Sequence, residues 1–121
     1  MKESIIKNKS FEFALQLIDL YKKLQEHREF VISKQMLRSG TSIGAKINEA
    51  LAGYSKSDFT YKMSISSKEA HETLYWLELL EKSQLVALNY SECITNCREI
   101  IKILTSIVKT AQNPKLTTLN P

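Results

Sequence analysis

Four stretches of this chain repeat apolar residues with the period of an α-helix, and short breaks separate them. An apolar residue at every third or fourth position places the apolar side chains along one face of a helix. The alternation of Val, Ile and Thr with polar residues that is typical of strands is largely missing, and the 121 residues include only three glycines and two prolines. The pattern therefore predicts a single all-α domain, a four-helix bundle.

The predicted bundle spans residues 1–112 and is followed by a flexible C-terminal tail at 113–121, where the periodicity stops. Side chains suited to capping helix N-termini stand near each expected start, and Gly53 is suited to stop the second helix. The capping candidates are Ser10, Ser33, Ser55 or Ser57, and Asn89 or Ser91. We therefore expect helices at about residues 10–27, 33–52, 56–81 and 91–112.

The first and third predicted helices carry more apolar surface than one packing partner needs. The first confines its polar side chains to a single strip, and the third has a second apolar stripe nearly opposite its core stripe. That second stripe marks either an interface with another copy of the chain or side chains that lie on the bundle's own surface. The candidate residues of an oligomer interface are Tyr61, Ile65, Tyr75, Trp76 and Leu79.

Two glycines one turn apart lie on the apolar arc of the second predicted helix, Gly40 and Gly44. Glycine costs about 1 kcal/mol relative to alanine in a helix interior, so another interaction has to offset this cost. The sequence matches neither glycine pattern of phosphate-binding loops. We therefore expect the glycines to allow a neighbouring helix to approach closely.

The net charge of +4 is unevenly distributed, because basic residues outnumber acidic ones between Phe30 and Ala70 and the sign reverses from His71 to Glu99. This excess either forms a basic face for a polyanion or belongs to ordinary solvated helix faces. If it binds nucleic acid, it does so mainly through phosphate contacts. The candidate nucleic-acid-binding residues are Lys34, Arg38, Lys46, Lys56 and Lys62.

No constellation in the sequence supports catalysis or metal binding. The only histidines, His27 and His71, have neither a His-x-x-x-His nor a Glu-x-x-His spacing, and neither Ser42 nor Cys93 has an identifiable base. We therefore expect no enzymatic activity, no metal and no cofactor.

The apolar stretches, the first residues and the cysteines indicate the cellular compartment. No stretch approaches the roughly 20 apolar residues that a membrane span needs, and the first residues do not lead into a signal peptide. Cys93 and Cys97 lie one helical turn apart, a spacing that favours a shared buried face over a disulfide. We expect a cytoplasmic protein without membrane contact.

Several runs in fixed order carry a family resemblance: residues 35–45 (QMLRSGTSIGA), 47–50 (INEA), 55–59 (SKSDF), 68–70 (KEA), 72–73 (ET) and 75–77 (YWL). Over about residues 8–112 the chain resembles the bacterial four-helix bundle proteins encoded within intervening sequences of 23S ribosomal RNA genes. The resemblance implies an up-and-down antiparallel bundle that assembles into a ring-like homo-oligomer, typically a pentamer. Lys46 departs from the asparagine that the family commonly has there, so a role of that amide does not carry over.

The resemblance leaves two classes of function open. The related accessory protein of diversity-generating retroelements binds nucleic acid and a reverse transcriptase, which implies an RNA- or DNA-binding accessory role for the oligomer. The alternative is a protein–protein scaffold without nucleic-acid binding, in which Tyr61, Trp76 and their neighbours contact the partner protein.

Overall fold

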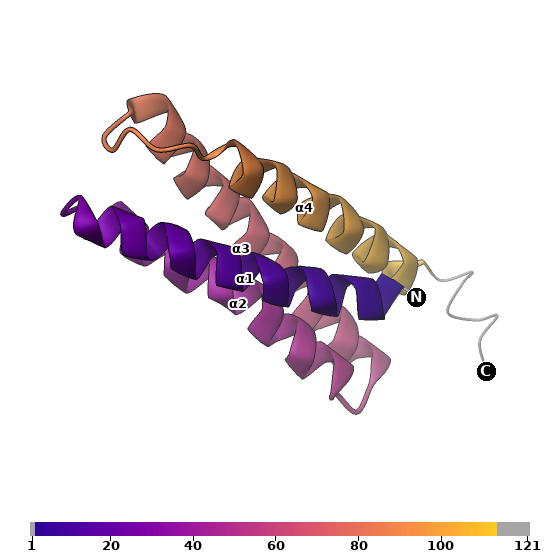
Figure 1. Ribbon diagram of the computed structural model, residues 1–121. Coiled ribbons are helices and arrows are strands. Elements are labelled where there is room, and N and C mark those ends of the chain that lie inside the picture. The colour runs from indigo at the N-terminus through magenta and orange to yellow at the C-terminus, as the bar shows by residue number, and fades with distance from the viewer. Residues whose placement is uncertain (1, 114–121) are drawn as a thin grey trace.

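The computed structural model describes residues 2–113, which form four α-helices in an all-α bundle. The helices are α1 (Lys2–Glu26), α2 (Ile32–Leu51), α3 (Lys56–Ser83) and α4 (Ser91–Gln112). Each helix packs against the ones before and after it, and α4 also returns to pack against α1 (Figure 1). The starts of α1 and α3 and the ends of α2 and α4 therefore lie together at what we call the N-terminal end of the bundle.

The observed helix bounds differ most from the predicted ones in α1, which begins at Lys2 and not at Ser10. Ser10 is buried inside the helix, where its hydroxyl donates to the carbonyl oxygen of Lys7 at 3.0 Å. The earlier turns are held by packing, because Ile6 is completely buried. α3 extends two residues beyond the predicted end, to Ser83, and α4 has the predicted bounds. Apart from Asn113, the predicted flexible tail lies outside the described residues.

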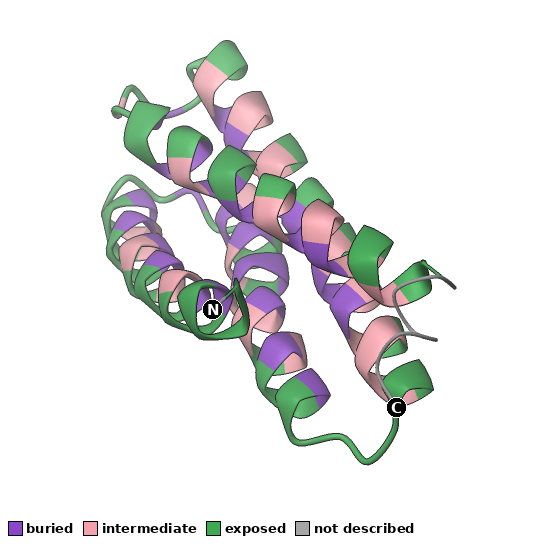
Figure 2. Cartoon of the chain, turned by 90° about the vertical axis from the view of Figure 1, so that its right-hand side faces the viewer, coloured by how far each residue is buried: buried purple, intermediate pink, exposed green. Residues whose placement is uncertain are grey.

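The core is built from the inward side of every helix, as the burial pattern in Figure 2 shows. Burial of these apolar side chains supplies the main driving force for folding. Cys93 and Cys97 belong to this core as free thiols on α4, in agreement with the expected buried face. The largest side chains that are fully buried include Leu17, Leu24, Met36, Ile47, Met63, Leu77 and Leu104.

Small polar side chains join α2 to α3 inside the bundle. The hydroxyl of Thr73 donates to Ser39 Oγ at 2.8 Å, and the hydroxyl of Ser66 donates to the carbonyl oxygen of Ile43 at 2.9 Å. Every buried side-chain nitrogen or oxygen in the described part of the chain has a hydrogen-bond partner. The two helices can therefore pack closely without the cost of an unsatisfied buried polar group.

α2 is capped by a residue of the preceding connection and not by Ser33 as predicted. Arg28 adopts a left-handed backbone conformation with φ of 62°, and Glu29 follows it. The Glu29 carboxylate accepts hydrogen bonds from the backbone N–H groups of Val31, Ile32 and Ser33 at 2.6–3.0 Å. These are the donors that the first turn of a helix leaves without intrahelical partners. Ser55, in contrast, caps α3 as predicted, because its hydroxyl accepts from the N–H of Asp58.

The two glycines of α2 face α1, which confirms that they allow a neighbouring helix to approach closely. A Cβ atom built on Gly44 would lie 3.2 Å from Ser10 Oγ, and one built on Gly40 would overlap Leu17 Cδ1. The small side chain of Ser10 and the missing side chain of Gly44 together set the short separation of α1 and α2 at this point.

Candidate functional site

The structure divides the five predicted nucleic-acid-binding residues between the two ends of the bundle. Lys34 lies in the first turn of α2, at the end that holds the α1–α2 connection. Lys46, Lys56 and Lys62 lie near the α2–α3 connection, at the N-terminal end of the bundle. Arg38 stands between these groups on α2, so the five residues do not form one patch.

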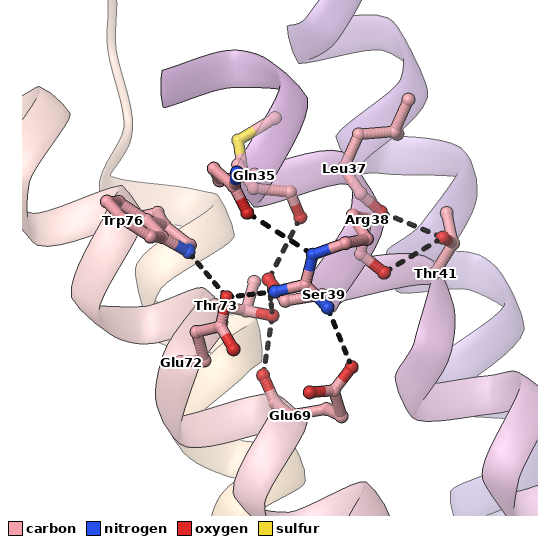
Figure 3. Close-up of polar contacts among 10 residues, drawn as sticks. Gln35, Leu37, Arg38, Ser39, Thr41, Glu69, Glu72, Thr73 and Trp76 are labelled. Atoms are coloured by element: carbon pink, nitrogen blue, oxygen red, sulfur yellow. Dashed lines mark hydrogen bonds and ion pairs between the residues drawn. The ribbon is translucent and has the colours of Figure 1, made fainter. Parts of the chain in front are cut away.

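Arg38 is held by acidic residues of α3 (Figure 3). Its Nη2 contacts Glu72 Oε2, its Nη1 lies 3.4 Å from Glu69 Oε2, and its Nε donates to Gln35 Oε1 at 3.2 Å. Two carboxylates therefore balance its single charge. The guanidinium fork that could bind a phosphate is already occupied by partners within the chain.

Glu72 also joins Arg38 to the only tryptophan of the chain. The indole Nε1–H of Trp76 donates to Glu72 Oε2 at 2.9 Å (Figure 3). This hydrogen bond is the largest cause that lowers the pKa of Glu72 from its ordinary value. Partial burial opposes the shift, and the Arg38 guanidinium adds to it. Glu72 is therefore a fixed anion that orients two neighbouring side chains.

Glu49 sits between two of the lysines at the N-terminal end. Lys62 Nζ lies 2.9 Å from Glu49 Oε1 and Lys46 Nζ lies 3.4 Å from the same oxygen. The hydrogen bond from Lys62 is the main cause that lowers the pKa of Glu49, and the same bond raises the pKa of Lys62. One carboxylate forms ion pairs with two ammonium groups, so positive charge remains in this cluster.

Three further lysines reach this end, namely Lys109 and two that the sequence interpretation had not assigned to a site, Lys2 and Lys7. Lys56 of the predicted set is exposed, and the additional Lys7 and Lys109 are exposed as well. Lys2 is also exposed, and its Nζ donates to the hydroxyl of Ser106 on α4. Early lysines meet the end of α4 because α1 begins at Lys2 and runs antiparallel to α4. The extended α1 and the bundle topology are the signals that would have pointed to them.

The five predicted interface residues lie along the outward side of α3. Tyr61 and Tyr75 are 62% and 58% exposed, and Ile65 and Leu79 are partly exposed. Trp76 is half-buried and packs against the core. Its ring meets the ring of Tyr75 edge-on, with 5.1 Å between the ring centroids. The predicted outward stripe therefore exists, although Trp76 belongs partly to the bundle's own surface.

An apolar stripe on α1 is exposed in the same way. Phe11, Leu15 and Ile18 are 63%, 47% and 36% exposed, and they recur at helical spacing. Beside them, a groove of about 660 Å³ runs between α1 and α4. Glu12, Leu15, Asp19 and Glu92 are among its lining residues, and Gln16 accepts a hydrogen bond from Asn96 across it at 2.9 Å. The wide apolar arc expected for the first helix is thus only partly used by the core.

Neither a metal site nor a membrane-spanning helix is found among residues 2–113. No three His, Cys, Asp or Glu side chains of this range are grouped to hold a metal ion. No helix in it combines the length and the apolar character needed to cross a membrane. His27 is occupied by a local contact, since its Nδ1 lies 2.8 Å from the carbonyl oxygen of Lys23.

Comparison with known proteins found a family match and a match to a solved structure. The family model described as 23S rRNA-intervening sequence protein matches residues 2–106. A protein of unknown function from the S23 ribosomal protein family of Bacteroides thetaiotaomicron VPI-5482, with a crystal structure at 1.70 Å resolution, is 50% identical. The match covers 90% of this chain and 99% of that chain, with a TM-score of 0.86. The comparison with curated proteins found no match.

Proposed function

Because the chain belongs to the 23S rRNA-intervening sequence protein family, we propose that it works as a homo-oligomeric nucleic-acid-binding protein that catalyses no reaction. The related crystal structure is that of a protein of unknown function, so the proposal rests on this chain's own residues. A pentamer is the assembly that the family resemblance implies.

The observation that carries the proposal is the collection of lysines at the N-terminal end of the bundle. The starts of α1 and α3 and the ends of α2 and α4 bring together Lys2, Lys7, Lys46, Lys56, Lys62 and Lys109. The acidic residues of the same region are fewer, namely Glu3, Glu12, Glu49 and Asp58. At the opposite end, acidic residues such as Glu26, Glu81 and Glu92 offset the basic ones more evenly. The N-terminal end is therefore the surface best suited to phosphate groups.

Assembly strengthens this argument, because each copy adds the same lysine cluster to the surface of the oligomer. Single phosphate contacts by lysine are weak, but several contacts on one nucleic acid act together. Lysine recognises a phosphate as a point charge and does not read a base sequence. We therefore expect binding that depends strongly on salt and only weakly on sequence, with RNA or DNA as the ligand.

Binding is tested by fluorescence anisotropy with a structured RNA and a duplex DNA, from about 50 mM salt upward, where phosphate contacts weaken steeply. The informative variant combines Lys46→Gln, Lys56→Gln and Lys62→Gln. A plot of log K against log salt has a negative slope, and each lost phosphate contact makes this slope less steep by about 0.9 on duplex DNA. The variant should therefore bind more weakly and with a smaller salt dependence than the wild type.

Two single variants serve as matched controls for this experiment. Arg38→Gln removes a charge that Glu69 and Glu72 already balance, and Lys34→Gln removes a lysine at the opposite end. Both should bind nearly as the wild type does. Equal binding of the triple variant and the wild type would place the polyanion site elsewhere.

A protein scaffold is the second candidate function, favoured by the exposed aromatic side chains of α3. Tyrosine, tryptophan and arginine dominate the binding energy of many protein interfaces, and Tyr75, Trp76 and Arg38 lie together here. If the wild type binds neither nucleic acid at about 50 mM salt, where phosphate contacts are strong, the scaffold function replaces the first proposal.

A further inference from the structure

The groove between α1 and α4 lies where polar contacts join these two antiparallel helices (Figure 1). Lys9 of α1 forms an ion pair with Glu99 of α4. Further along the groove, the Asn96 side chain of α4 donates a hydrogen bond to Gln16 of α1 at 2.9 Å. The volume of about 660 Å³ lies within the range of roughly 300–1,000 Å³ that is usual for ligand sites. The groove is therefore large enough to hold a ligand.

Acidic side chains gather in this groove although the whole chain has a net charge of +4. Four of its lining residues carry a carboxylate, and within the described part of the chain Lys9 is the one positively charged residue of the lining. Because Lys9 is paired with Glu99, three carboxylates remain, those of Glu12, Asp19 and Glu92. The ion pairs among residues 2–113 include none of these three. The groove is therefore a negatively charged site on a basic protein.

Other lysines of α1 lie outside the groove. Lys7, Lys22 and Lys23 are exposed on the same helix, and none of them lines the groove. No ion pair of the described residues joins one of these lysines to Glu12 or Asp19. A ligand that neutralises the groove therefore has to bring its own positive charges.

The lining also offers apolar surface beside the carboxylates. Phe13 and Ile100 contribute to it from the core, and Leu15 is 47% exposed. Lysine and arginine side chains combine an apolar stem with a charged head group. Such a side chain can pack its stem on Leu15 while its head group reaches a carboxylate. The lining therefore suits lysine or arginine better than a small inorganic cation.

The amide pair in the groove matches the hydrogen-bonding groups of a peptide. The bond from Asn96 to Gln16 uses the Asn96 nitrogen and the Gln16 oxygen. It leaves one acceptor, the Asn96 oxygen, and one donor, the Gln16 nitrogen, for another molecule. A peptide unit carries the matching N–H and C=O groups. A free polyamine has no carbonyl group, so the amide pair favours a segment of a protein.

We propose that this groove binds a basic, extended segment of a partner protein. One lysine or arginine of the segment pairs with Glu12, and a second pairs with Asp19 and Glu92. A peptide group between them bonds the amides of Gln16 and Asn96. The inference goes beyond nucleic-acid binding and uses a different surface from the lysine cluster at the N-terminal end.

The spacing of the carboxylates sets the spacing of the basic residues in the segment. Glu12 and Asp19 are seven positions apart on α1, which corresponds to about 10 Å along a helix. Three residues of an extended peptide span about the same distance. Because lysine and arginine side chains are long, the two basic residues should stand about two to four positions apart.

Fluorescence anisotropy with a labelled peptide that alternates alanine and lysine tests the proposal. We use about 150 mM salt, which screens exposed charges more than about 8 Å apart. The groove variant combines Glu12→Gln, Asp19→Asn and Glu92→Gln. It should bind this peptide at least about tenfold more weakly than the wild type, because each basic residue loses its opposite charge. The same peptide with glutamate in place of lysine should not bind the wild type.

A charge-matched variant serves as the control and combines Glu3→Gln, Glu26→Gln and Glu81→Gln. It has the same net charge as the groove variant, but none of its substitutions lies in the groove lining. It should bind the lysine peptide as the wild type does. Circular dichroism should show that both variants remain helical.

Spermine distinguishes a peptide site from a site for free polyamines. The double variant Gln16→Leu and Asn96→Leu removes the amides and keeps the carboxylates. It should bind the lysine peptide more weakly while its affinity for spermine stays unchanged, because spermine has no peptide group. Spermine that displaces the peptide from the wild type at equal concentration would assign the groove to polyamines and overturn the proposal.

Three further results would also overturn it. The lysine peptide could fail to bind the wild type, or the charge-matched variant could lose as much affinity as the groove variant. The groove variant could also lose an oligomeric mass that the wild type shows in light scattering, which would make the groove an interface between copies. Each of these failures leaves nucleic-acid binding untouched, because that function is tested separately with the variant of Lys46, Lys56 and Lys62.

Discussion

Glu29 and Ser33 hydrogen-bond each other twice at the start of α2. The Ser33 backbone N–H donates to Glu29 Oε1 at 2.6 Å, and the Ser33 hydroxyl donates to the Glu29 carbonyl oxygen at 2.8 Å. Gln25 adds bonds to the same carbonyl oxygen and to Ser33 Oγ. The α1–α2 connection is therefore fixed by side chains that bond the backbone N–H groups which a helix start leaves without intrahelical partners.

Glu29→Gln should lower the stability of the protein at neutral pH, and the loss should shrink as the pH falls. Burial raises the pKa of Glu29, but its hydrogen bonds to Ser33, Ile32 and Val31 outweigh burial, so the folded-state pKa lies below the ordinary value. The ionised carboxylate therefore stabilises the fold above the unfolded-state pKa, and this contribution disappears as the pH falls through the folded-state pKa. Urea unfolding at several pH values measures the difference, which we expect to be about 0.5–2 kcal/mol at pH 7. Glu26→Gln, on the exposed last turn of α1, is the control, and equal effects of both variants would contradict the capping role.

Gly44→Leu should destabilise the bundle by roughly 1–3 kcal/mol, because the added side chain has no room against Ser10 on α1. Thermal unfolding followed by circular dichroism is the measurement. Ala45→Leu places the same side chain on the next, exposed position of α2 and should have little effect. If both variants melt together, the close contact between α1 and α2 at Gly44 does not limit the packing.

The fluorescence of Trp76 should titrate with Glu72. Because the folded-state pKa of Glu72 is lowered, the carboxylate should hold the indole N–H until the pH falls below the ordinary glutamate range. We expect a change in tryptophan emission whose midpoint lies below the ordinary glutamate range, at a pH where circular dichroism still shows folded protein. Glu72→Gln should abolish the transition, whereas Glu69→Gln should retain it. A transition unchanged by Glu72→Gln would assign the signal to another group.

Cys93 and Cys97 should be nearly inert to thiol reagents in the folded protein. Burial is the main cause that raises the pKa of Cys93 to about 11 and that of Cys97 to about 12. At pH 8 only about 0.1% of the Cys93 thiol would be ionised, and the thiolate is the reactive form. Absorbance with an aromatic disulfide reagent should show slow modification of native protein and rapid modification of both thiols in denaturant. Rapid reaction of either cysteine in the native protein would show that the α4 core opens.

The helices and their inward faces could be predicted from the sequence because helical periodicity is a local property. The bounds of α4 were predicted correctly, and the cysteines and glycines lie on the buried and close-packed positions expected for them. The start of α1 was predicted wrongly, because Ser10 is as well suited to a buried position inside a helix as to an N-cap. Its burial opposite Gly44 depends on how α1 and α2 dock, which no local pattern contains.

In the candidate site, the difference between what the sequence predicts and what helix packing decides is larger. Arg38 and Lys46 share the outward arc of α2 by sequence, but Glu69 and Glu72 lie 31 and 34 positions from Arg38 and neutralise it only after α3 has packed. Lys2 joins the basic end only because α1 and α4 run antiparallel. The sequence by itself determined that four helices form and which side of each helix is apolar, since both follow from the order of residues within a few turns. Only the tertiary structure decided which charges remain free, because charge neutralisation depends on distances between helices that are far apart in the chain.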